Sequence, residues 1–213
     1  WELRKKEIKD LLSHHFLGYP PHFKTKVKGV TQKVENDALG GKATSSVVDI
    51  QLKVFNKFFS FPCNLVIPKN VEKPPVFLYI SFSSTLADEH LPLEEIIDHG
   101  FAVASFYYQD VAPDKNDDFS NGLALLATRN RFDSWGKISM WAFAASRIMD
   151  YLETLDSIDS KRVAVIGHSR LGKTALWCGA NDERFSLVVS NNSGAGGAAL
   201  FRGKVGEKIK DLV

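Results

Sequence analysis

One stretch of the chain, residues 163–177, limits the possible folds more strongly than any other. It begins with the apolar run Val163-Ala164-Val165-Ile166, passes through a turn that starts at a glycine, and continues as a good helix-forming sequence. We therefore predict a strand, a sharp turn and a helix. Two kinds of site share this pattern. Read as G-x-S-x, it is a nucleophile elbow that exposes Ser169; read as G-x-x-x-x-G-K-[ST], residues 167–174 match a phosphate-binding P-loop.

The order of the other predicted elements indicates an α/β fold. An amphipathic helix over residues 2–14 is followed by residues 22–44, which are polar and give no clear prediction. Two strands, 45–55 and 59–67, read as an antiparallel hairpin. Later apolar runs are typical of strands buried on both faces of a parallel sheet, with helices between them. The predicted later elements are strands 76–82, 101–108, 162–166 and 185–189, helices 91–99, 137–155 and 170–180, and an irregular segment 109–136.

From this order we predict one domain, residues 1–213, with an α/β-hydrolase-type, mainly parallel sheet. It has an antiparallel N-terminal hairpin, helices on both faces, and an N-terminal helix with an irregular lead-in over residues 1–44. The long segment 109–136 carries Asp110, Asp114, Asp117 and Asp118. We expect these carboxylates to be solvated, although a loop of this length often borders a functional cleft.

Composition excludes several classes of protein. The net charge of +2 is nearly neutral, which argues against a nucleic-acid or membrane surface. No apolar run approaches the roughly 20 residues that span a bilayer. The chain begins at Trp1, so we expect any signal peptide to have been removed. Cys63 and Cys178 are expected to be buried free thiols, and neither cysteines nor histidines have the spacing of a metal site. We expect no metal and no cofactor.

Local chemistry favours the nucleophile over the phosphate loop. A P-loop needs a carboxylate at the end of a nearby strand to hold Mg²⁺, and the strand after the turn ends without one at Asn191-Asn192. His168, Arg170 and Leu171 are also bulky for a backbone that wraps phosphate. Counted from Ser45, the strand before the turn is the fifth, which is where an α/β-hydrolase carries its nucleophile. A nucleotide-binding protein that uses Gly167–Thr174 stays open as a second interpretation.

The departure of this turn from G-x-S-x-G is itself informative, because Leu171 stands where the second glycine belongs and Gly172 follows it. Residues 167–176, Gly-His-Ser-Arg-Leu-Gly-Lys-Thr-Ala-Leu, resemble the G-[CH]-S-R-x-G-K-x-A motif of the glucuronoyl esterases, carbohydrate esterase family 15. Residues 193–199, Ser-Gly-Ala-Gly-Gly-Ala-Ala, are similar to the second motif of that family. The start of the chain, with Leu17-Gly18-Tyr19-Pro20, resembles its bacterial branch, whose members are often labelled acetyl xylan esterases.

The resemblance implies a role for several residues. Ser169 is similar to the serine nucleophile, Arg170 to the arginine that stabilises the oxyanion, and Lys173 to the lysine that contacts the uronate sugar. The implied substrates are plant cell-wall carbohydrate esters, foremost 4-O-methyl-glucuronoyl esters of xylan, and the implied location is secreted or periplasmic. Asn192 stands where the fungal branch has its catalytic glutamate, so the acid would have to come from elsewhere.

The expected catalytic histidine is missing after the serine. Hydrolases of this type place their residues in the order serine, acid, histidine, and no histidine follows Ser169. We therefore expect that the fold is incomplete at the C-terminus and that these 213 residues have little activity alone. Two further functions stay open at this point: an acetyl xylan esterase or similar acyl esterase, and a non-catalytic domain. The oligomeric state is left open.

Overall fold

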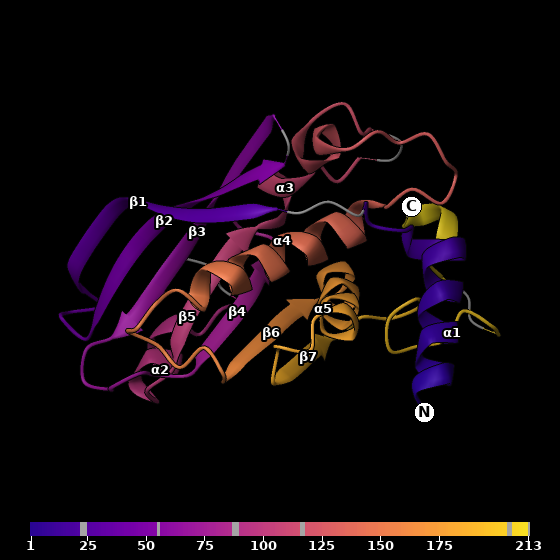
Figure 1. The fold of residues 1–213 in the computed structure, drawn as a ribbon. Coiled ribbons are helices and arrows are strands. Elements are labelled where there is room, and N and C mark those ends of the chain that lie inside the picture. The colour runs from indigo at the N-terminus through magenta and orange to yellow at the C-terminus, as the bar shows by residue number, and fades with distance from the viewer. Residues whose placement is uncertain (22–24, 55, 87–89, 116–117, 204–205, 213) are drawn as a thin grey trace.

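The protein folds around a mixed seven-stranded sheet with the strand order β1-β2-β3-β5-β4-β6-β7 (Figure 1). The computed structural model describes residues 1–213 except 22–24, 55, 87–89, 116–117, 204–205 and 213. The strands are β1 (Lys26–Ala38), β2 (Ala43–Val54), β3 (Lys57–Pro68), β4 (Val76–Ser81), β5 (Ala102–Tyr107), β6 (Val163–His168) and β7 (Leu187–Asn191). The α-helices are α1 (Glu2–Leu12), α2 (Leu93–Asp98), α3 (Tyr108–Val111), α4 (Lys137–Leu152) and α5 (Arg170–Asn181).

The sheet has an antiparallel half and a parallel half. β1, β2, β3 and β5 pair antiparallel in that order, whereas β4 pairs parallel with β5 and β6, and β6 pairs parallel with β7. The predicted hairpin is confirmed, with Val54 opposite Lys57 at its closed end. Phe55, its predicted last residue before the turn, lies outside the described residues. Antiparallel strands at the start of the chain thus lead into parallel strands, which is the α/β-hydrolase-type sheet predicted from the order of elements.

The prediction of an irregular lead-in was wrong for residues 26–38, which form the edge strand β1. Most of its side chains are exposed, so its sequence lacks the apolar alternation that marks a half-buried strand. Gly29 packs closely against α4, because a Cβ atom there would overlap the ring of Tyr151, and Val27 packs against the main core. β1 therefore pairs with β2 through backbone atoms along a mostly exposed strand, and a mostly polar sequence does not predict such pairing.

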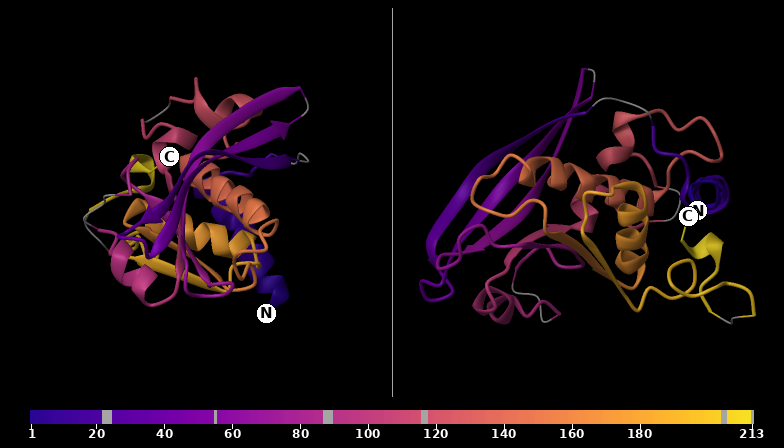
Figure 2. Two further views of the ribbon diagram at one scale, coloured as in Figure 1. Left: turned by 90° about the vertical axis from the view of Figure 1, so that its left-hand side faces the viewer. Right: turned by 60° about the horizontal axis from the view of Figure 1, so that its bottom comes forward.

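Helices cover both faces of the sheet, as predicted (Figure 2). Alternate residues of β4 show this directly. Leu78 and Ile80 join the main core beneath α4 and α5, whereas Tyr79 belongs to a separate cluster on the opposite face with Leu91 and Val103. The short helix α2 lies on that second face. Trp141 and Trp177 are buried in the main core.

The N-terminal helix stands at the end of the molecule where the parallel strands finish (Figure 1). The predicted helix continues beyond Leu12 as a π-helix over Ser13–Leu17, and no residue of α1 itself is buried. Phe16 of the π-helix packs edge-to-face against Phe201, with 5.8 Å between ring centroids. The irregular segment 109–136 contains the end of α3 and a 3₁₀-helix, Gly122–Leu126. Among the described residues, no helix is both long and apolar enough to cross a membrane.

Candidate active site

A one-residue turn joins β6 to α5 at the carboxyl edge of the sheet. β6 ends at His168 and α5 begins at Arg170, so Ser169 alone reverses the chain direction. Its backbone has φ 52° and ψ −122°, a conformation that is unfavourable for any residue with a Cβ atom. The Ser169 amide donates to the Asn191 carbonyl at 2.9 Å, which fixes the turn to the end of β7. The strand, sharp turn and helix predicted for this stretch are thus confirmed.

Two glycines make this turn sterically possible. A Cβ atom on Gly167 would overlap the Leu171 carbonyl oxygen. A Cβ atom on Gly172 would lie 2.9 Å from the Asn191 carbonyl oxygen and 3.1 Å from the Ser193 Cβ atom. The close approach between helix and strand thus occurs at residue 172, which explains why the second glycine follows Leu171 instead of replacing it.

The same geometry excludes a P-loop. A phosphate loop wraps its ligand with free backbone N–H groups. Here the amides of Gly172 and Lys173 donate to the Ser169 carbonyl, at 2.9 and 3.2 Å, as part of the first turn of α5. Thr174, which would bind Mg²⁺, instead donates its hydroxyl to the Arg170 carbonyl at 3.1 Å. The letters G-x-x-x-x-G-K-T therefore occur at the start of a helix in which these groups already have partners.

Charged side chains near the start of α5 form three ion pairs. The Arg170 guanidinium contacts the Asp114 carboxylate through Nη1, and its Nη2 lies 3.7 Å from Glu207 Oε1. The Lys173 side chain is only 2% exposed, and its Nζ donates to Glu207 Oε2 at 2.6 Å. Two cations from α5 therefore alternate with two carboxylates that come from distant loops. A buried ammonium needs such a partner, because desolvation of an unpaired charge is costly.

The structure places all three predicted site residues at the start of α5: Ser169 is the residue before the helix, and Arg170 and Lys173 lie in its first turn. It adds Asp114 and Glu207, which were not singled out as site residues. The expectation that Asp114 is simply solvated was wrong, because its side chain is 22% exposed and ion-paired. Asp117, from the same loop, lies outside the described residues. Neither carboxylate carries a motif that distinguishes it from its charged neighbours in sequence.

Histidines are not placed to activate the serine in the part of the chain that the structure describes. No hydrogen bond joins the Ser169 hydroxyl to a histidine among these residues. His168 precedes Ser169 on β6 and lies opposite Asn191 of β7. The Nδ1 of His14 instead lies 3.3 Å from the buried Asp133 carboxylate. His22 lies outside the described residues. Within the described ranges, no group of three histidine, cysteine, aspartate or glutamate side chains has the geometry of a metal site.

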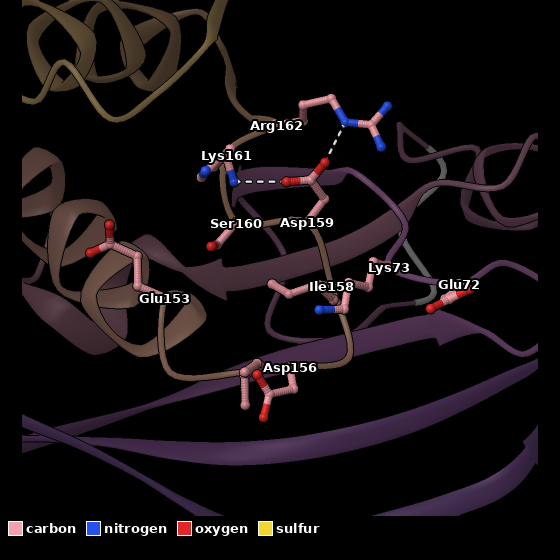
Figure 3. Close-up of a pocket in the computed structure, with 10 residues that line it drawn as sticks. Glu72, Lys73, Glu153, Asp156, Ile158, Asp159, Ser160, Lys161 and Arg162 are labelled. Carbon is pink, nitrogen blue, oxygen red and sulfur yellow. Dashed lines mark hydrogen bonds and ion pairs between the residues drawn. The ribbon is translucent and has the colours of Figure 1, made fainter.

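A separate hollow of about 520 Å³ lies at the opposite end of the sheet (Figure 3). It is formed by the connection between α4 and β6 and by the one between β3 and β4, which include Asp156 and Lys73. Asp159 there accepts hydrogen bonds from the Lys161 amide and the Arg162 side chain. Ligands of open α/β sheets bind beyond the carboxyl ends of the strands, where Ser169 lies, and this hollow is at the amino ends.

The sheet order, the one-residue elbow and the helix after it define an α/β-hydrolase fold, and comparisons with known proteins agree. A family model described as glucuronyl esterase, fungi, matches residues 50–211. Carbohydrate esterase MZ0003, from an unknown prokaryotic organism, is 34% identical; the match covers 98% of this chain and 57% of that protein. The 4-O-methyl-glucuronoyl methylesterase of Neurospora crassa is 28% identical, with 98% of this chain and 48% of that protein covered.

Solved structures give the same result. A glucuronoyl esterase from Solibacter usitatus superposes with a TM-score of 0.83 at 33% identity, over 93% of this chain and 60% of the other. The chain belongs to the glucuronoyl esterase family, as the sequence resemblance indicated. It spans about half to three fifths of the length of these relatives.

Proposed function

We propose that this chain carries the nucleophile and the oxyanion site of a serine esterase that cleaves 4-O-methyl-glucuronoyl esters. The observation that carries the proposal is the strained one-residue elbow, which presents Ser169 beside two cations on the first turn of α5. Strain of this kind costs about 1–3 kcal/mol and is retained where function requires it. The relatives named as 4-O-methyl-glucuronoyl methylesterases suggest the substrate class.

In the proposed reaction, the Ser169 hydroxyl oxygen attacks the ester carbonyl while a base takes its proton. The negative charge that develops on the carbonyl oxygen lies at the start of α5, where the Arg170 amide has no partner within the helix. The Arg170 guanidinium adds a second, cationic donor. Collapse of the intermediate expels the alcohol with a proton and leaves a glucuronoyl ester on Ser169, which water then hydrolyses to uronic acid and free serine.

Lys173 and Glu207 are proposed to bind the sugar. The partly exposed Glu207 carboxylate can accept from the hydroxyl groups of a uronate ring, and the almost fully buried Lys173 holds this carboxylate through a hydrogen bond of 2.6 Å. The fixed geometry lowers the entropy that substrate binding would otherwise cost. We further propose that the protein acts outside the cytoplasm, where cell-wall esters occur.

The test is hydrolysis of benzyl glucuronate by the protein at its full encoded length. We expect turnover that Ser169→Ala reduces at least about a thousandfold, as for other serine hydrolases whose nucleophile is removed. A polypeptide of residues 1–213 alone should be close to inactive, because no histidine follows Ser169. Turnover that survives Ser169→Ala would refute the proposed nucleophile.

A broader acyl esterase is the second candidate. One structural relative, at 33% identity and a TM-score of 0.78, is titled a promiscuous CE15 esterase from a marine bacterial metagenome. Parallel assays on acetylated xylan and benzyl glucuronate separate the two candidates. A preference for the acetyl ester, again lost in Ser169→Ala, would favour the broader function.

A further inference from the structure

The loop segment Ala112–Lys115 is fastened to helix α4 on both sides of Asp114. Trp141 donates its indole N–H to the Ala112 carbonyl at 3.0 Å. Lys137 donates through Nζ to the carbonyls of Pro113 and Lys115, both at 2.6 Å. Both donors are buried in the interior. Three hydrogen bonds from one rigid helix therefore fix the backbone that carries Asp114, although this backbone belongs to a loop.

The Asp114 carboxylate is itself oriented by two different partners. One oxygen forms the ion pair with Arg170 Nη1, and the other accepts a hydrogen bond from the Tyr108 hydroxyl at 3.2 Å. Gln109 donates to the same hydroxyl at 3.1 Å, which leaves its proton directed to Asp114. Burial, together with the Asp114 charge, raises the pKa of Tyr108 to about 12, so the hydroxyl keeps its proton at any physiological pH.

This arrangement matters because arginine is long and flexible. A free arginine side chain samples many rotamers, and a guanidinium contributes to catalysis only if it is already in place when charge develops. We propose that Asp114 is a positioning residue, which holds the Arg170 guanidinium toward the ester oxyanion while Tyr108 and Lys137 hold Asp114. This inference rests on the proposed function, since that function gives Arg170 its role.

The test is a double-mutant cycle on the protein at its full encoded length, with benzyl glucuronate as substrate. We expect Arg170→Ala to lower kcat about 100- to 1000-fold. Asp114→Asn should lower kcat about tenfold with little change in KM, because it misplaces a group needed in the transition state. In the Arg170→Ala background, Asp114→Asn should change kcat less than about twofold, because Asp114 acts through Arg170.

Asp118→Asn is the matched control on the same loop. Asp118 accepts its hydrogen bonds from the amide and hydroxyl of Ser120, so kcat should be unchanged. An unchanged or raised kcat in Asp114→Asn would overturn the inference. An equal fall in the Arg170→Ala background would also overturn it, because it would indicate a purely structural role.

A second measurement does not depend on turnover. ¹⁵N NMR of the arginine side chains should show hindered rotation of the Arg170 guanidinium in the wild type and loss of that hindrance in Asp114→Asn. Free rotation in the wild type, or no change in the variant, would overturn the inference. If the wild type shows hindered rotation but hydrolyses no glucuronate ester, the proposed function fails while the positioning contact stands. The two failures are therefore distinguishable.

Discussion

Ser169 combines a reactive side chain with an unfavourable backbone. At φ 52° and ψ −122°, a Cβ atom is crowded by its own backbone, and glycine would relieve the strain. The turn keeps serine, which suggests that the hydroxyl is needed there. The sequence motif identifies this residue, because few kinds of site other than a nucleophile elbow have a glycine-bounded turn between a strand and a helix. Asp114 and Glu207 had no such signal, since their roles arise only when distant loops meet at α5.

The strain predicts an order of stability among variants of this residue. Ser169→Gly should be more stable than Ser169→Ala by about 1 kcal/mol, because alanine retains the Cβ atom that causes the strain. Urea denaturation of the two variants measures the difference. If Ser169→Ala is equally or more stable, the turn is not strained in solution.

The two cysteines give a separate prediction about pH. Cys63 and Cys178 are free and buried, as expected from the sequence, and burial raises the pKa of each thiol from 9.0 to about 12. The folded state therefore holds these protons more tightly than the unfolded chain. The resulting stability is complete below about pH 9 and is lost as pH rises toward 12.

We expect Ellman's reagent to find almost no reactive thiol in the native protein at pH 8 and two in denaturant. The urea concentration at the midpoint of unfolding should decrease as the pH is raised from 8 to 10.5. Replacing both cysteines with alanine should make this decrease smaller. Rapid labelling of the native protein by Ellman's reagent would contradict the prediction, because it would show that the thiols are accessible.

Close packing between β6 and α5 sets the geometry of the elbow. The element order, the hairpin and this junction could all be predicted, because apolar runs and the spacing of glycines indicate them within short stretches of sequence. β1 could not, because it is an exposed edge strand whose polar residues pair through backbone atoms. Strand β7 begins and ends two residues later than predicted, at 187–191 instead of 185–189. Its side chains are only partly buried, so the sequence marks its ends weakly.

The glycine contacts predict which substitution breaks this junction. Gly167→Ala should cost at least about 3 kcal/mol, because the new Cβ atom overlaps the Leu171 carbonyl and the backbone must move. Gly136→Ala is the matched control, since its Cβ atom would meet the Leu17 carbonyl at an ordinary 3.5 Å. Thermal melting compares the two. Similar losses in both variants would contradict the packing argument.

On the scale of the whole molecule, the site is assembled from segments far apart in the chain. The elbow follows β6, Asp114 follows α3, and Glu207 comes from the C-terminal segment beyond β7 (Figure 1). Glu207 thus links that segment to helix α5, through Lys173 at 2.6 Å and Arg170 at 3.7 Å. Because Lys173 is almost fully buried, loss of its partner would leave a charge without compensation.

Glu207→Gln should therefore lower the free energy of unfolding by about 1–3 kcal/mol. This is less than for a fully buried ion pair, because the Glu207 carboxylate is partly exposed. Glu94→Gln is the control, because Glu94 pairs with Lys42 on the open surface, where an ion pair contributes less than about 1 kcal/mol. Equilibrium urea denaturation in low salt measures both. Equal effects would mean that the Lys173–Glu207 pair behaves like a surface pair.

The most direct test of the central claim is to trap the acyl-enzyme. The protein at its full encoded length is mixed with benzyl glucuronate, quenched in acid and digested for mass spectrometry. We predict one glucuronoyl group on the peptide that contains Ser169, and no adduct in Ser169→Ala. An adduct on another residue, or ester hydrolysis with an unchanged rate in Ser169→Ala, would contradict the assignment of Ser169 as the nucleophile.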